Sequence, residues 1–215
     1  MLTARSHDMS FMLDSLDDIE ARIPELEGRI DHDRAVAAGH SFGGMIAMLK
    51  LGLKMESQTD GTLVDMADDR FKAAIVMSGV GEMQPMKSLP QVPTMSADAF
   101  DGLTQALIAS GGTRDEGNVG TGELYPWEWR MSAYTLAPAG DKYAGVLQDA
   151  DHYLGGLICR SNKGGEDDPV AVEVVRAAQT AFLDAYVKRD QAALEWLRTY
   201  DFGAMSDGRA TLEYK

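Results

Sequence analysis

The architecture of this chain can be read from Arg34-Ala35-Val36-Ala37-Ala38-Gly39-His40-Ser41-Phe42-Gly43-Gly44. Residues 34–38 form a short, mostly apolar run, which is typical of a strand that is covered on both faces. Residues 39–43 match the pattern G-x-S-x-G, and residues 45–51 have helical character. The stretch therefore predicts a buried strand, a sharp turn and the start of a helix.

The turn would carry Ser41 at its tip, in strained backbone where bulky neighbours two residues away would collide. Gly39 and Gly43 would remove those side chains. Ser41 Oγ would then project above the sheet, near the positive end of the following helix. The backbone N–H of Phe42 would point at a developing oxyanion. The alternative interpretation is a glycine-rich strand-to-helix connection with no chemical role.

Composition narrows the function classes. The chain has 215 residues, with 34 acidic and 20 basic side chains and a formal net charge of −14. This length fits one domain, residues 1–215. The acidic balance argues against a nucleic-acid partner, because phosphate contacts need clustered lysine and arginine. It also argues against adhesion to an anionic membrane, and it leaves the oligomeric state open.

Targeting and cofactor signals are not visible. The longest apolar runs fall far short of a membrane span, and residues 1–10 lack the apolar centre of a signal peptide, so the localisation is unknown. Cys159 is the only cysteine, which excludes an intrachain disulfide, and it is expected to be buried and structural. No His, Cys and Asp residues cluster at ligand spacing, so neither a metal nor an organic cofactor is expected.

Strands alternate with helices along the chain. Apolar runs predict strands at 34–38, 71–78, 103–110 and 143–148, with an edge strand near 210–214. Helices are expected from the turn at Ser41 to about Leu53, after Asp168-Pro169, and after Asp190. Asp168 and Asp190 would each cap the helix that follows. The alternation predicts an α/β fold, a mostly parallel sheet flanked by helices.

An amphipathic surface helix is predicted over residues 8–23 and should pack on the sheet. Ser6 or Asp8 would cap its start, and Pro24 would end it. Its apolar stripe would be Met12, Leu16, Ile19 and Ile23.

Three large aromatic residues lie in a probable loop at 117–132: Tyr125, Trp127 and Trp129. They are interpreted either as the wall of a substrate pocket or small cap (117–135), or as side chains that seal the core from outside.

The elbow Gly39-His40-Ser41-Phe42-Gly43-Gly44 resembles the nucleophile elbow of the α/β-hydrolase superfamily. Its GHSFGG form is similar to the predicted dienelactone-hydrolase and platelet-activating-factor-acetylhydrolase-like branch. Three further stretches resemble that branch, and the likeness covers roughly residues 8–198: Gly28-Arg29-Ile30-Asp31, Gly112-Thr113-Arg114-Asp115-Glu116-Gly117 and Asp149-Ala150-Asp151-His152-Tyr153-Leu154-Gly155-Gly156.

The resemblance implies a nucleophile, an acid and a histidine in that chain order, each on a loop after a strand. Of the four histidines, His7 and His32 precede the elbow, and His40 lies inside it and cannot easily turn back on its neighbour. His152 remains as the candidate base, the alternative being a surface histidine.

Asp115 follows the strand at 103–110 and is the candidate acid, which would orient His152. Its rivals are Glu116, Asp141, Asp149 and Asp151, and Arg114 could pair with any of these acids. The adjacent Asp151 is the least suited, because neighbouring residues rarely reach each other's side chains.

The resemblance departs from the superfamily at the N-terminus. Only 40 residues precede Ser41, so about four early strands and the loop that gives the second oxyanion donor are not found. Three explanations are considered: a fragment, which we favour, a naturally short fold, or a sheet completed by another chain.

The sequence thus predicts a serine hydrolase that cleaves carboxylic esters with Ser41, Asp115 and His152. Serine in place of the cysteine of strict dienelactone hydrolases favours an ester, thioester or lipid acyl group. The alternatives are a non-catalytic or truncated hydrolase-like domain, or a lipase, acyltransferase or peptidase with the same three residues.

Overall fold

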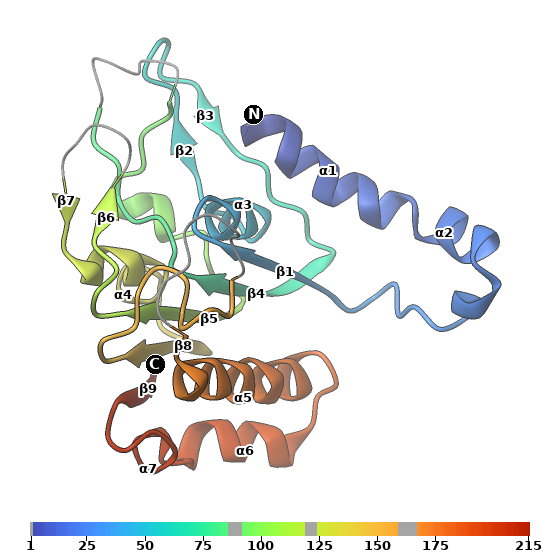
Figure 1. The fold of residues 1–215 in the computed structure, drawn as a ribbon. Coiled ribbons are helices and arrows are strands. Elements are labelled where there is room, and N and C mark those ends of the chain that lie inside the picture. The colour runs from blue at the N-terminus through green and yellow to red at the C-terminus, as the bar shows by residue number, and fades with distance from the viewer. Residues whose placement is uncertain (1, 86–91, 119–123, 159–166) are drawn as a thin grey trace.

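A five-stranded sheet forms the centre of the protein (Figure 1). The computed structural model describes residues 2–85, 92–118, 124–158 and 167–215. The strands follow one another across the sheet in chain order: β1 (Ala35–His40), β4 (Phe71–Met77), β5 (Ala106–Gly112), β8 (Lys142–Leu147) and β9 (Ala210–Tyr214). The first four are parallel and β9 runs antiparallel at the far edge. The predicted fold class, a mostly parallel sheet flanked by helices, is confirmed.

The remaining elements connect these strands. The helices are α1 (Leu2–Asp14), α2 (Leu16–Arg22), α3 (Phe42–Lys50), α4 (Ser132–Thr135), α5 (Pro169–Tyr186), α6 (Gln191–Thr199) and α7 (Phe202–Met205). Three 3-10 helices are described: η1 (Pro24–Leu26), η2 (Ala97–Phe100) and η3 (Trp127–Met131). Two short strand pairs complete the list: β2 (Met55–Glu56) with β3 (Leu63–Val64), and β6 (Gly117–Asn118) with β7 (Leu124–Tyr125).

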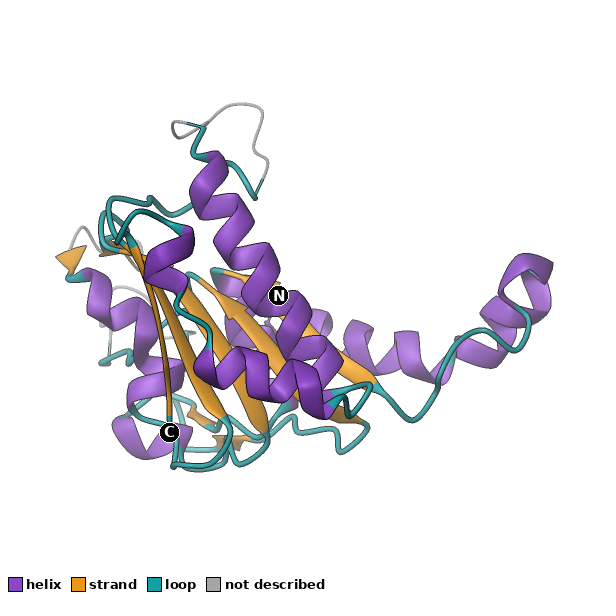
Figure 2. Ribbon diagram, turned by 90° about the horizontal axis from the view of Figure 1, so that it is seen from below, coloured by secondary structure: helices purple, strands orange, loops and turns teal. Residues whose placement is uncertain are grey.

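Each face of the sheet has its own core, because successive side chains of a strand point to opposite faces. One face carries α3 and η3, and its strand residues include Ala74, Val76, Leu107 and Ala109. The other face carries α5 and α6, and its strand residues include Ala73, Ile75, Ala106 and Ile108. Figure 2 shows the helices over the sheet from below. The inner strands are therefore mostly apolar, as is typical of a doubly covered parallel sheet.

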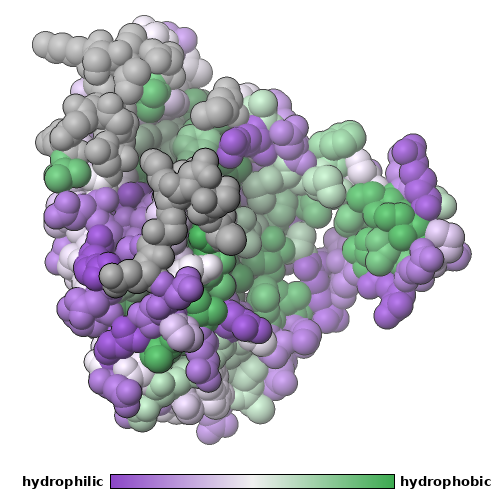
Figure 3. All heavy atoms as spheres, viewed as in Figure 1, coloured by the Kyte–Doolittle hydropathy of each residue, from purple (hydrophilic) through white to green (hydrophobic). Residues whose placement is uncertain are grey.

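The N-terminal helix differs from its prediction. Ser6 and Asp8 lie inside α1, which begins at Leu2 and is separated from α2 at Ser15. Leu2, Ser6, Met9 and Leu13 form the face of α1 that lies toward the body. The predicted stripe was wrong, because Met12 and Ile23 are 53% and 43% exposed. The helices α1 and α2 form an N-terminal arm. Figure 3 shows apolar surface on this arm and on the part of the body beside it.

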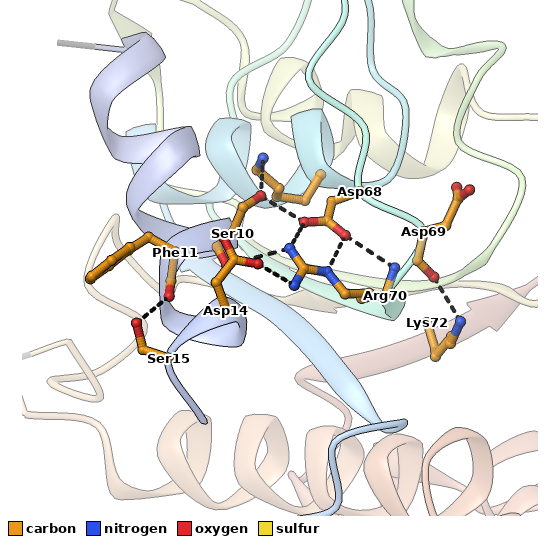
Figure 4. A network of polar contacts seen from close by, with 9 residues as sticks. Ser10, Phe11, Asp14, Ser15, Asp68, Asp69, Arg70 and Lys72 are labelled. Atoms are coloured by element: carbon orange, nitrogen blue, oxygen red, sulfur yellow. Dashed lines mark hydrogen bonds and ion pairs between the residues drawn. The ribbon is translucent and has the colours of Figure 1, made fainter. Parts of the chain in front are cut away.

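An ion-pair network holds α1 against the start of β4 (Figure 4). Arg70 donates to Asp14 of α1 at 2.6 Å and to Asp68 at 2.7 Å. Ser10 Oγ of α1 donates at 2.6 Å to Asp68 Oδ2, the oxygen that also accepts from Arg70. The hydrogen bonds from Arg70 lower the pKa of Asp68. Polar contacts of α1, in addition to its apolar face, therefore fix its position.

The caps predicted for the two C-terminal helices are confirmed. Asp168 accepts a hydrogen bond from Ala171 N at the start of α5, and Asp190 accepts from Ala192 N at the start of α6. Arg209 donates to both oxygens of Asp168, at 2.7 and 2.8 Å, and so ties the start of β9 to α5. These bonds lower the pKa of Asp168 to about 2. Among the described residues, no helix has the length and apolar character needed to cross a membrane.

Asp168→Ala should lower the free energy of unfolding by about 1–2 kcal/mol, because the cap and the Arg209 pair are both lost. Asp168→Asn keeps an acceptor for the cap and should cost only about 0.5 kcal/mol. The folded-state pKa lies below the unfolded value of about 3.9, so the contribution is complete above that pH and disappears as the pH falls through about 2. Urea unfolding from pH 7 to pH 2 measures this. Asp167→Asn is the control, since Asp167 is exposed; equal losses for Asp167→Asn and Asp168→Asn would contradict the assignment.

Candidate active site

The candidate residues gather at the carboxyl ends of four parallel strands. Ser41 follows β1, Ser78 follows β4, Asp115 lies beyond β5 and His152 lies beyond β8. Because parallel strands end at the same edge of a sheet, these loops meet there. The sheet topology thus brings to one edge residues that are far apart in the sequence, such as Ser41 and His152.

The β1–α3 turn holds Ser41 at φ 54° and ψ −119°, in a region that most side chains avoid. A Cβ at position 39 would lie 2.1 Å from the carbonyl carbon of Gly43, so only glycine fits. At Gly43, however, an added Cβ meets nothing within 4 Å in the described part of the chain. The steric prediction is therefore right for Gly39 and wrong for Gly43. Phe42 N–H opens α3, where first-turn N–H groups have no intrahelical acceptor.

His152 and Asp115 contact each other directly. His152 Nδ1 lies 2.9 Å from both carboxylate oxygens of Asp115. Because an ionised carboxylate only accepts, Nδ1 is the nitrogen that donates to Asp115, and in the neutral ring Nε2 is then the acceptor. The Asp115 side chain is 1% exposed and that of His152 is 26% exposed. The pair therefore joins a buried carboxylate to an imidazole that solvent or a ligand can reach.

A buried arginine that the sequence analysis did not identify supports Asp115. Arg130 Nε donates to Asp115 Oδ1 at 3.1 Å, and Arg130 Nη1 donates to Gly79 O at 3.2 Å. Burial lowers the pKa of Arg130, and Asp115 opposes this shift. Arg114, the arginine considered from the sequence, is exposed. The sequence held only an indirect signal for this pair. A buried aspartate needs a cation, and Arg130 directly follows the segment that contains Tyr125, Trp127 and Trp129 (the aromatic segment).

His40, in the elbow, contacts His152. Its Nε2 donates to the backbone carbonyl of His152 at 2.6 Å, and the two rings lie 4.4 Å apart. Ser78 Oγ donates to the same carbonyl at 3.3 Å. Burial is the main reason that the pKa of His40 is lowered. His40 is thus engaged with the histidine loop, in keeping with its exclusion as the base.

The rival acids have other surroundings. Asp141 pairs with Arg198 at 2.8 Å. It directly precedes β8 and so lies at the amino end of that strand, whereas His152 lies beyond its carboxyl end. Asp151 accepts a hydrogen bond from Tyr153 N within its own loop. Glu116 and Asp149 are exposed. Of these acids, Asp115 is the one whose carboxylate hydrogen bonds to His152.

The aromatic segment is folded rather than a loop, since it contains β7 and η3. Trp129 is 8% exposed, and its Nε1 donates to Glu82 O at 2.8 Å. Tyr125 stacks on it with ring centroids 4.9 Å apart, and Trp127 packs against the same core. This packing agrees with the core-sealing interpretation for Trp129. A substrate wall made of the three aromatics stays a prediction.

In the described ranges, one group of side chains lies close enough together to bind a metal ion. It consists of Asp17 and Glu20 in α2 and His32 after η1. Asp17 is 95% exposed, and Glu20 Oε1 already accepts from the N–H groups of Arg29 and Ile30. The cluster lies outside the loops at the carboxyl edge of the sheet. Cys159, expected to be structural, lies outside the described residues.

Residues 3–202 match the model of the alpha/beta hydrolase family. The match covers most of the chain, and the elbow, acid and histidine loops all lie within it. The chain therefore belongs to the alpha/beta hydrolase family, and hydrolase activity is the chemistry that this membership supports. No curated protein matches the chain. The narrower likeness to the dienelactone-hydrolase and platelet-activating-factor-acetylhydrolase-like branch stays a prediction.

Gly39→Ala should destabilise the protein by about 2 kcal/mol or more, because its Cβ would overlap the backbone of Gly43. Gly43→Ala should stay within about 1 kcal/mol of the wild type, because its Cβ has open space. Thermal and urea unfolding of the two variants, measured side by side, test this. Equal destabilisation by both would show that the elbow is not packed as described.

Proposed function

We propose that this protein is a serine hydrolase that cleaves carboxylic esters through an acyl-enzyme on Ser41. His152 is the general base and acid, and Asp115 orients it. The observation that carries the proposal is the contact between His152 Nδ1 and Asp115 at 2.9 Å, beside a serine in elbow geometry. In the neutral imidazole this contact supports the tautomer with the proton on Nδ1, whose Nε2 can act as a base.

In the first half-reaction Ser41 Oγ attacks the acyl carbon while His152 Nε2 takes its proton. The described residues show no hydrogen bond between Ser41 Oγ and His152, and such contacts commonly tighten only when substrate binds. Phe42 N–H and the positive end of α3 stabilise the oxyanion. When the tetrahedral species collapses, the His152 imidazolium protonates the departing alcohol.

In the second half-reaction water replaces the alcohol. His152 removes a proton from water, the hydroxide attacks the acyl carbon, and the bond to Ser41 Oγ breaks with return of the proton. One ester and one water thus give one acid and one alcohol. Asp115 remains ionised throughout and stabilises the imidazolium in each half.

The substrate class we propose is a small-molecule ester, thioester or lipid acyl group. The likeness to the platelet-activating-factor-acetylhydrolase-like branch and the serine nucleophile both favour it. Tyr125 and Trp127 are proposed to form an aromatic wall beside the site together with Trp129. Lipase, acyltransferase and peptidase chemistry would use the same three residues and differ only in acyl donor and acceptor.

Ser41→Ala should abolish the hydrolysis of p-nitrophenyl butyrate, with at least about a 10⁴-fold loss of kcat, because the acyl-enzyme cannot form. Circular dichroism should show the same fold in both proteins. Ser96→Ala is the matched control, since Ser96 is exposed on the loop before η2. Undiminished turnover by Ser41→Ala would contradict the proposal, and an inactive but folded wild type would favour a non-catalytic domain.

A further inference from the structure

We propose that Arg130 is a positioning residue for the reaction: it holds Asp115 ionised and aimed at His152. The inference rests on the proposed function, and it adds a fourth side chain to the three already named. Arg130 acts through Asp115 and is not assigned a contact with the substrate. Three observations carry it: the burial of the pair, the two-point attachment of the guanidinium, and the packing of η3.

The burial of the pair gives the first argument. The Asp115 side chain is 1% exposed and the Arg130 side chain is 7% exposed. A buried carboxylate without a cation takes up a proton instead of staying charged. His152 cannot supply a permanent charge, because it must be neutral to act as a base. A protonated Asp115 would no longer be a purely accepting partner for Nδ1–H, so the tautomer of His152 would not be fixed.

The attachment gives the second argument. Arg130 Nε binds Asp115 Oδ1, while Nη1 binds the carbonyl of Gly79 just after β4. The planar guanidinium therefore links the β5 loop to the end of β4 at a fixed spacing. A lysine could place one charge near Asp115, but it could not reproduce this fork.

The packing of η3 gives the third argument. Arg130 lies over the Trp129 ring, 5.0 Å from its centroid. The Trp129 indole is itself fixed by Glu82 O, and Ser132 Oγ donates to Trp129 O at 2.9 Å. These contacts fix Trp129, and its ring gives the guanidinium a fixed surface to lie on. The aromatic segment, singled out in the sequence, also acts as the support for Arg130.

The expected pH effect follows from the charges around Asp115. The titratable and charged groups that face it are Arg130 from η3, His152 from the β8 loop, and His40 from the end of β1. Removing the Arg130 charge favours the protonated forms of Asp115 and His152. The reaction needs Asp115 ionised and His152 neutral. As the pH is lowered, activity should therefore begin to fall at a higher pH in the variant than in the wild type.

The test is the pH profile of kcat/KM for p-nitrophenyl butyrate, whose acid limb reports the free enzyme. In Arg130→Met the midpoint of the acid limb should move up by about 1 pH unit, and kcat should fall about tenfold or more at its optimum. Arg130→Lys keeps the charge, so its midpoint should stay near the wild-type value while kcat still falls. Arg114→Met is the matched control, because Arg114 is exposed beside Asp115 in sequence; its profile should be that of the wild type.

An acid limb in Arg130→Met that coincides with the wild type, with amplitude reduced only in proportion to the folded fraction, would overturn the inference. If Arg130→Met does not fold, Arg130→Lys decides: wild-type kcat in that variant would show that the fork is not needed. A failure of the proposed function is seen separately, as Ser41→Ala that retains turnover.

Discussion

The backbone of Gly39 lies against that of Gly43, and the candidate site depends on this contact. It allows α3 to start directly at the end of β1, with a single residue, Ser41, carrying the strain at φ 54°. The short turn places Ser41 at the carboxyl edge of the sheet, directly before the first N–H groups of α3. His40, on the strand side of the same turn, reaches the backbone of the His152 loop. The elbow therefore fixes Ser41, the proposed nucleophile, and also anchors the loop of the proposed base.

The parallel sheet converts this local geometry into a site. Four consecutive strands end at one edge, so that loops distant in sequence face each other there. A chain of polar contacts runs from Gly79 O through Arg130 and Asp115 to His152, and its inner members are almost fully buried. Buried charges are tolerated when they are paired and hydrogen bonded, as these are. Because Asp115 and Arg130 are packed inside the protein, the orientation of His152 depends on how the core packs around them.

Local signals made the centre of the fold predictable. The apolar runs at 71–78 and 143–148, and the caps Asp168 and Asp190, specify their elements without help from distant residues. Asp115 and His152 could be named as candidates because chain order and loop position restrict the choices, and their side chains are in contact. Arg130 was not, because its pairing depends on how η3 folds back over the sheet. The packed face of α1 was missed for a similar reason, since it is selected by the Arg70 network and by the core around α3.

The most direct test of the account is the position of covalent attack by a fluorophosphonate, mapped by mass spectrometry of the digested protein. We expect one adduct, on the peptide that carries Ser41, because in the described parts of the chain this is the serine that combines an elbow turn with a histidine oriented by a carboxylate. It also predicts that Asp115→Asn forms this adduct slower by about 10⁴-fold, through loss of the correct tautomer. An adduct on another serine, or labelling at the wild-type rate in Asp115→Asn, would contradict the account.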